Sequence, residues 1–137
     1  MSKEVGKSEK MEGASDLSGI ADIASVLFGS QIQAHIFHLQ TKSLSEHMAL
    51  GHYYDEVEGL IDGLVESYQG VYGIIQSYSI PAVESYSSKS QLVKYFGGLK
   101  ESIETARVGI DDSYLQNQID TVIELIASTK YKIEFLS

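Results

Sequence analysis

The chain has 137 residues, a formal net charge of −9 and no cysteine. This length suits one domain with a core of its own. The lack of cysteine excludes disulfides, zinc knuckles, iron–sulfur clusters and thiol nucleophiles, and it fits an intracellular protein. The acidic charge disfavours contact with nucleic acid or anionic lipid, and no apolar run reaches the ~20 residues of a membrane span. We therefore expect a cytoplasmic protein with no nucleic-acid partner and no membrane partner.

The N-terminal stretch differs in composition from the rest of the chain. Residues 1–14 mix three lysines with three glutamates and lack the apolar segment of a secretory signal. We interpret them as a disordered tail, and we predict that residues 15–137 form a single helical domain. Ser15 and Asp16 are residue types that favour the start of a helix.

A first helix is predicted from there to about residue 40. Apolar side chains recur along it at steps of three and four, on two stripes that together cover a wide arc of the helix. One stripe ends at His38. The positions are Ile20, Ala24, Leu27, Gln31, Ala34 and His38 on the first stripe, and Phe28, Ile32, Ile36 and Leu39 on the second.

The second helix has a well-marked start. Ser43 followed by Glu46 is a capping-box pattern, an apolar stripe follows it, and we predict that the helix ends near Gly70. The stripe consists of Leu50, Tyr54, Val57, Ile61, Leu64 and Tyr68. Asp62 and Glu66 occupy a different face, about 120–160° around the helix from the centre of the stripe.

Residues 70–90 interrupt the helical pattern. They contain the only proline, Pro81, and a run rich in serine and tyrosine. This composition predicts a crossover of about twenty residues with room for a short helix. Further helices are predicted from about residue 90 to 108, and from Asp111 and Asp112, which cap the last helix, to the C-terminus. Two short connections and one long one predict an all-α fold, a ferritin-like four-helix bundle with its long crossover between the second and third helices.

Four side chains carry the candidate chemistry: His38, His47, Asp62 and Glu66. Imidazole and carboxylate are together a ligand set for a divalent transition metal. His47 and Asp62 lie on one helix, about 22 Å apart along its axis, which is too far for them to share a metal within one chain. A two-fold axis near Asp55 would bring His47 of one chain to the two carboxylates of a second chain. We therefore predict a metal site shared between two subunits.

These residues resemble the metal-site region of a known family, the Dps miniferritins. The similar segments are HLQTKSLSEH at 38–47, YDE at 54–56, LID at 60–62, Glu66, and the last helix from Asp111 to Phe135. The resemblance implies a ferritin-like fold, a twelve-subunit shell, oxidation of Fe(II) by peroxide or dioxygen, and storage of ferric iron. It also implies that His38 and His47 of one subunit bind iron together with Asp62 and Glu66 of the two-fold mate.

The sequence departs from the pattern of that family in three places. The two histidines are closer by three residues than is usual, Leu39 stands where the family has tryptophan, and residues 1–14 carry no net positive charge for DNA. His35 and Asp55 are candidate secondary ligands, whereas His52 has a poor spacing for the same helix face as His47. The sequence leaves open whether the protein is a ferroxidase-type enzyme or a non-catalytic ferritin-like structural or interaction protein.

Overall fold

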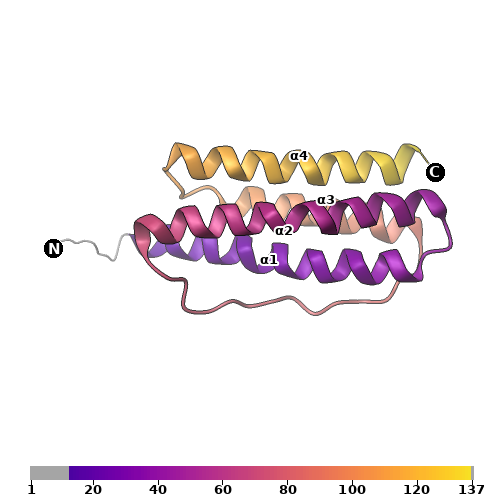
Figure 1. The fold of residues 1–137 in the computed structure, drawn as a ribbon, viewed down its shortest axis with the longest axis horizontal. Helices are drawn as coiled ribbons and strands as arrows, with labels where there is room; N and C mark the ends of the chain where they lie inside the picture. The colour runs from indigo at the N-terminus through magenta and orange to yellow at the C-terminus, as the bar shows by residue number, and fades with distance from the viewer. Residues whose placement is uncertain (1–12, 137) are drawn as a thin grey trace.

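The structure, a computed structural model, describes residues 13–136, with side chains from Gly19 onward, and this described part is helical without any strand. The helices are α1 (Gly13–Gln40), α2 (Leu44–Tyr72), α3 (Lys89–Ala106) and α4 (Ser113–Phe135) (Figure 1). The predicted all-α four-helix bundle is therefore confirmed. Of the predicted tail, residues 1–12 lie outside the described part of the chain. None of the described helices is long and apolar enough to cross a membrane.

α1 begins two residues before the predicted domain boundary. Gly13 and Ala14, which belong to the predicted tail, are helical, and so are the predicted cap residues Ser15 and Asp16. A favourable cap contributes only about 1 kcal/mol. A helix of 28 residues can therefore start before a residue type that favours a cap.

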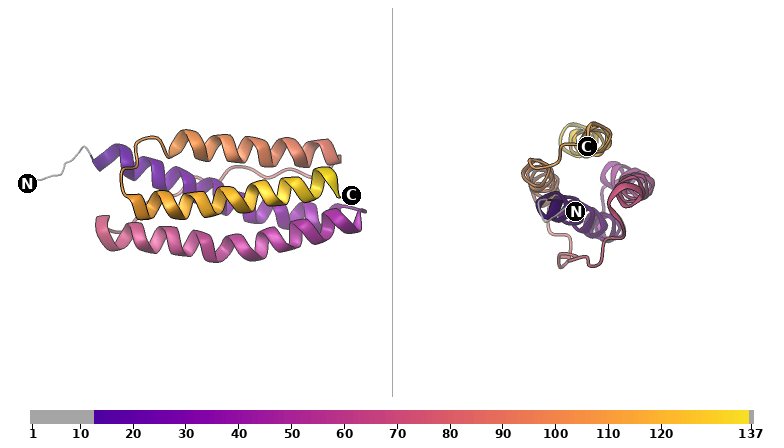
Figure 2. Two further views of the ribbon diagram at one scale, coloured as in Figure 1. Left: turned by 90° about the horizontal axis from the view of Figure 1, so that it is seen from above. Right: turned by 90° about the vertical axis from the view of Figure 1, so that its left-hand side faces the viewer.

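The helices pack in a square in which neighbouring helices are antiparallel. α1 contacts α2 and α3, and α4 contacts the same two helices from the other side. Figure 2 shows this arrangement end-on, and Figure 1 shows that α1 and α4 run in one direction while α2 and α3 run in the other. Buried aliphatic and aromatic side chains fill the space between them. The largest are Phe37, Tyr53, Tyr68 and Phe96.

Residues 73–88 link α2 to α3 without forming a helix, so the short helix for which the sequence had room is absent. The segment runs along the bundle beside α1 (Figure 1). The side-chain amide of Gln33 donates to the carbonyl oxygen of Glu84 and accepts from its N–H, each at 2.8 Å. Ser25 Oγ accepts from the N–H of Ser79 at 2.9 Å. Buried polar side chains of α1 thus replace the hydrogen bonds that a helix would have given this backbone.

The start of α2 is the predicted one, but the glutamate of the capping box has a different partner. Ser43 is the N-cap, and its Oγ accepts from the N–H of Glu46 at 3.3 Å. The N–H of Ser43 donates to Thr41 at 3.1 Å. The buried carboxylate of Glu46 accepts from Thr41 at 2.6 Å and from the hydroxyl of Tyr86 at 2.9 Å. Glu46 therefore ties the α1–α2 turn to the far end of the long connection.

The C-terminal end of α2 is set by Gly73 and not by Gly70. The helix continues through Gly70 to Tyr72, and the N–H of Gly73 donates to the carbonyl oxygen of Gln69 at 2.9 Å. Gly73 has a φ of 98°, in the region that favours glycine. The first glycine after the stripe is therefore not the one that stops the helix.

The predicted apolar stripe of α2 is confirmed except at Tyr54, and the second predicted stripe of α1 is only partly buried. On α2 the core residue is Tyr53, which is fully buried and shares a hydrogen bond of 2.6 Å with Ser30, whereas Tyr54 is only half-buried. On α1 the second predicted stripe faces outward in part, because Ile32 is 50% exposed and Leu39 is 70% exposed. α1 therefore presents apolar side chains that the described part of its own chain does not cover.

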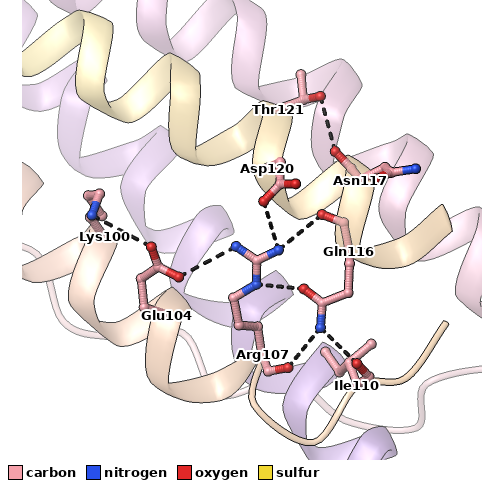
Figure 3. Close-up of polar contacts among 8 residues, drawn as sticks. All are labelled: Lys100, Glu104, Arg107, Ile110, Gln116, Asn117, Asp120 and Thr121. Carbon is pink, nitrogen blue, oxygen red and sulfur yellow. Dashed lines mark hydrogen bonds and ion pairs between the residues drawn. The ribbon is translucent and has the colours of Figure 1, made fainter. Parts of the chain in front are cut away.

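One arginine fastens the turn between α3 and α4 (Figure 3). Arg107 donates from Nε to Gln116 Oε1 at 2.6 Å, and from Nη2 to the carbonyl of Gln116 at 3.2 Å and to Asp120 at 2.8 Å. Its Nη1 reaches Glu104 at 3.4 Å. Gln116 in turn donates to the carbonyl oxygens of Arg107 at 3.0 Å and of Ile110 at 2.7 Å. All three guanidinium nitrogens are thus engaged within the turn.

Candidate metal centre

His38 and His47 face each other across the turn between α1 and α2. Their rings stack, with centroids 3.7 Å apart and planes inclined by 18°. Nδ1 of His38 lies 2.7 Å from the carbonyl oxygen of His47, and Nδ1 of His47 lies 2.9 Å from the carbonyl oxygen of His38. The two residues therefore hold each other by a reciprocal pair of hydrogen bonds, and we call them the histidine clasp.

These hydrogen bonds fix the tautomer of both rings. A carbonyl oxygen only accepts, so each Nδ1 must carry a proton, and in the neutral ring the lone pair is then on Nε2. Among the described residues, none hydrogen-bonds to the Nε2 of His38 or His47. Metal-binding histidines commonly donate their other ring N–H to a backbone carbonyl in this way. The clasp thus presents two imidazole nitrogens with the lone pair that a metal requires.

Aromatic rings and a glycine surround the clasp. The ring of Tyr54 lies edge-on to His38, with centroids 5.2 Å apart, and stacks on His35, with centroids 4.3 Å apart. His35 is exposed, and its ring centroid is 6.1 Å from that of His38. Gly51 lies one turn after His47 and borders the His38 ring. One candidate secondary ligand, His35, therefore lies next to the clasp.

Asp62 and Glu66 lie away from the histidines of their own chain. Both are exposed on α2, and the unbroken helix separates His47 from Asp62 by about 22 Å along its axis. Asp55, the other candidate secondary ligand, is exposed about halfway between them. Among the described side chains, no three of His, Asp or Glu are grouped so that they could hold a metal ion. The four-residue site would need a second chain, and it stays a prediction.

His52 lies away from the clasp. It is exposed and lines a surface hollow together with Met48 of α2 and with Lys132 and Leu136 from the C-terminal end of the chain. This position makes His52 a suitable control histidine for substitutions in the clasp.

Comparison with known protein families gives one result. Residues 38–133 match a family of unknown function, DUF5856. The chain belongs to this family. The match begins at His38 and extends through α2, the long connection, α3 and most of α4, so it includes His47, Asp62 and Glu66. No curated protein and no solved structure matches the chain. The resemblance to Dps proteins stays a prediction.

Two neighbours of the clasp in this DUF5856 chain, Gly51 and Tyr54, were not predicted from the sequence. Gly51 follows His47 by four residues, a spacing that places both on one helix face, so the periodicity could have indicated it. Tyr54 was expected in the core because it follows Leu50 by four. The pattern does not distinguish Tyr54 from Tyr53, because either can follow Leu50 on the apolar face.

Proposed function

We propose that the protein is a ferritin-like iron-binding protein of the Dps type. It oxidises Fe(II) with peroxide or dioxygen at sites shared across a two-fold subunit interface, and it stores the ferric product. The observation that carries this proposal is the histidine clasp, in which both Nδ1 atoms are bonded to carbonyls and both Nε2 atoms remain for a metal. Imidazole together with carboxylate fits iron in its ferrous and ferric states.

The path of the chain supports the ferritin-like part of the proposal. α1 and α2 form one antiparallel hairpin, α3 and α4 form a second, and residues 73–88 join the two along the length of the bundle. Ferritin-like bundles have one such long connection. Many of them bind metal between their helices, but the buried positions described here are almost entirely apolar. In this chain the metal ligands therefore have to lie on an outer face.

The outer face of α2 supports pairing with a second copy. A two-fold axis at Asp55 would bring His47 opposite Asp62 of the partner subunit, because the two residues lie at nearly equal distances on either side of Asp55. Gly59 follows Asp55 by four residues, and nothing lies within 4 Å of a side-chain position there. A second helix can approach closely at such a residue.

Exposed apolar side chains on α1, the helix packed beside α2, support an interface on this side of the bundle. Ile32 and Leu39 on α1 are each at least half exposed. Exposed apolar surface commonly marks a protein interface. A second copy that pairs through α2 would cover part of α1 while it completes the ligand set.

The two ligand types have different parts in the proposed oxidation. The clasp imidazoles bind Fe(II), and the partner subunit's Asp62 and Glu66 stabilise Fe(III) as the positive charge increases. Each Fe(II) gives up one electron, and one molecule of H₂O₂ takes two electrons and two protons and leaves as two waters. The described ion pairs all lie on α3, α4 and the turn between them, so none of them neutralises the exposed carboxylates of α2. These carboxylates attract the ferrous substrate.

A specific observation favours a second candidate, a ferritin-like structural or interaction protein without metal chemistry. The carbonyl of His38 is among the last four of α1, which lack a partner within the helix. The bond from Nδ1 of His47 therefore caps α1, and the clasp would have a use in the turn alone. Iron oxidation and assembly measurements separate the two candidates.

The first test concerns assembly. Sedimentation of the full chain at about micromolar concentration should show an oligomer, and a twelve-subunit shell would agree with the Dps resemblance. Gly59→Leu, which fills open space beside Asp55, should weaken the assembly. Gly98→Leu is the matched control, because Gly98 also borders open space but lies on α3. A wild-type monomer would contradict both the assembly and the shared site.

The second test concerns iron. Wild-type protein should oxidise Fe(II) faster than buffer, and peroxide should accelerate the reaction. Asp62→Ala or Glu66→Ala should remove most of that rate, because each substitution deletes an anionic ligand while leaving the core intact. Glu56→Ala is the matched control, since Glu56 is also exposed on α2. It lies about 100° around the helix from the face that carries Asp62 and Glu66. Equal rates in all variants would contradict the iron site.

Histidine variants in the same test distinguish the binding of Fe(II) from its oxidation. His38→Ala should weaken ferrous binding first, because it deletes one of the two clasp nitrogens. His52→Ala should bind and oxidise Fe(II) like wild type, since His52 lies on another part of α2. If His52→Ala and His38→Ala lose activity equally, the clasp is not the binding site.

A further inference from the structure

Gly51 borders the His38 ring so closely that a side chain here would press on the ring. An ideal Cβ at this position would lie 3.1 Å from Cε1 and 3.2 Å from Nδ1 of His38. Carbon atoms in ordinary contact are about 3.5–4.0 Å apart. We infer that Gly51 is a positioning residue of the histidine clasp, because its lack of a side chain allows the His38 ring to lie flat on His47.

The His38 ring cannot move aside without losing contacts that define the clasp. One face stacks on His47, with centroids 3.7 Å apart, and the ring of Tyr54 lies edge-on to it, with centroids 5.2 Å apart. The two ring atoms nearest to the added Cβ are Cε1 and Nδ1. Nδ1 is the donor of the 2.7 Å hydrogen bond to the carbonyl oxygen of His47. A shift of the ring by a few tenths of an ångström would therefore act directly on the hydrogen bond that fixes the tautomer.

Two other glycines of α2, unlike Gly51, border open space. Nothing lies within 4 Å of a side-chain position at Gly59 or Gly70. Alanine is more stable than glycine inside a helix, so Gly70→Ala should stabilise the helix without touching any neighbour. Gly51→Ala makes the same change in helix preference but adds the contact with His38. The pair Gly51→Ala and Gly70→Ala therefore isolates the effect on the imidazole.

The consequence for metal binding rests on the proposed function. With Gly51 in place, both clasp rings keep Nδ1 protonated and present Nε2 to a metal. With alanine in place, the His38 ring turns or shifts, and the position of its Nε2 changes with it. Loss of a partner that orients a metal-binding histidine commonly weakens metal affinity by about 10- to 100-fold.

Two measurements on the full chain test this inference. In ¹⁵N NMR of the metal-free protein, His38 and His47 should each be protonated at Nδ1. Gly51→Ala should shift the His38 signals or change its tautomer, while Gly70→Ala should leave both rings as in wild type. In titrations with Co²⁺, Gly51→Ala should bind about tenfold or more weakly than Gly70→Ala.

A double substitution distinguishes contact with the His38 ring from a general effect of Gly51→Ala on folding. In the His38→Ala background, Gly51→Ala has no imidazole to press on, so it should raise the melting temperature as Gly70→Ala does. In the wild-type background, Gly51→Ala should raise the melting temperature less than Gly70→Ala. Equal shifts in both backgrounds would overturn the inference.

The outcomes for Gly51 and for the iron proposal are distinguishable. If Gly51→Ala leaves the His38 signals unchanged, the positioning role is wrong, whatever the metal titration gives. If the His38 signals change in Gly51→Ala alone while wild-type protein binds no Co²⁺ and no Fe²⁺, the positioning role stands and the iron proposal fails.

Discussion

The two short turns of the bundle lie at opposite ends and use their polar side chains in opposite ways (Figure 1). In the α3–α4 turn all three nitrogens of Arg107 donate to Gln116, Asp120 and Glu104, and the turn leaves no guanidinium nitrogen unused. In the α1–α2 turn His38 and His47 each use one ring nitrogen for the turn. The second nitrogen of each ring has no partner among the described residues.

This difference distinguishes the α3–α4 turn, whose polar groups only stabilise the fold, from the α1–α2 turn, which is a candidate binding site. A network whose donors and acceptors are all engaged with each other stabilises one geometry and has nothing left for a ligand. A pair of rings that is held by Nδ1 alone is equally well oriented, but it retains two lone pairs. The comparison predicts that substitutions in the α3–α4 turn mainly lower stability, and that substitutions in the α1–α2 turn mainly weaken metal binding.

The largest effect is expected at Arg107. Arg107→Ala removes donors from the carbonyl and the side chain of Gln116, so we expect the free energy of unfolding to fall by about 2–3 kcal/mol in urea titrations. Lys100→Ala is the control, because its ion pair with Glu104 is 3.6 Å long and exposed, and it should cost about 0.5 kcal/mol or less. Metal binding per folded chain should not change. If Arg107→Ala abolished metal binding in folded protein, the division between the two turns would be wrong.

A second prediction compares the glycine at each turn. A Cβ at Gly19 would lie 2.7 Å from the backbone carbonyl oxygen of Ala106, next to the α3–α4 turn. Backbone cannot move aside as a side chain can, so Gly19→Ala should lower the free energy of unfolding by about 1–3 kcal/mol. Gly51→Ala, which meets an imidazole instead, should change stability less and the His38 ring more. The comparison would be contradicted if Gly19→Ala were the more stable variant of the two.

The helical periodicity accounts for the parts of the fold that could be predicted. Steps of three and four located the four helices, and Ser43 was predicted as the N-cap of α2 from local sequence. Helix length alone showed that His47 and Asp62 cannot share a metal in one chain. These inferences use only the spacing of residues along one helix, which the sequence contains in full.

The parts that could not be predicted depend on contacts between distant segments. The bond from Tyr86 to Glu46 joins residues far apart in the chain, and no local pattern indicates it. The stacking of the clasp depends on the angle at which α1 and α2 leave their turn. The choice of Tyr53 over its neighbour depends on Ser30, one helix away. Such contacts are decided by packing in three dimensions.

A third prediction concerns alkaline pH and Tyr53, a buried tyrosine of the core. Burial raises the pKa of Tyr53 well above its usual value near 10. Above pH 10 the unfolded chain loses the proton while the folded chain keeps it, so the unfolded state binds fewer protons and stability falls as pH rises. We expect a loss of about 1.4 kcal/mol at pH 11 from this group. Denaturant titrations from pH 9 to 11 should show a smaller loss in Tyr53→Phe, whereas Tyr131→Phe, an exposed control, should behave like wild type.

The smallest effect on stability is expected in the clasp itself, and it decides between the two candidate functions. His47→Ala removes a half-buried ring and one cap on the carbonyl of His38, so we expect a loss of about 1 kcal/mol in the free energy of unfolding. His52→Ala, on an exposed residue, should change stability by less than about 0.5 kcal/mol. Under the iron proposal, His47→Ala loses metal binding at this small cost in stability. The opposite result is that His47→Ala destabilises the protein as much as Arg107→Ala and that wild-type protein binds no iron. In that case the clasp only stabilises the turn, and the non-catalytic candidate is the better description.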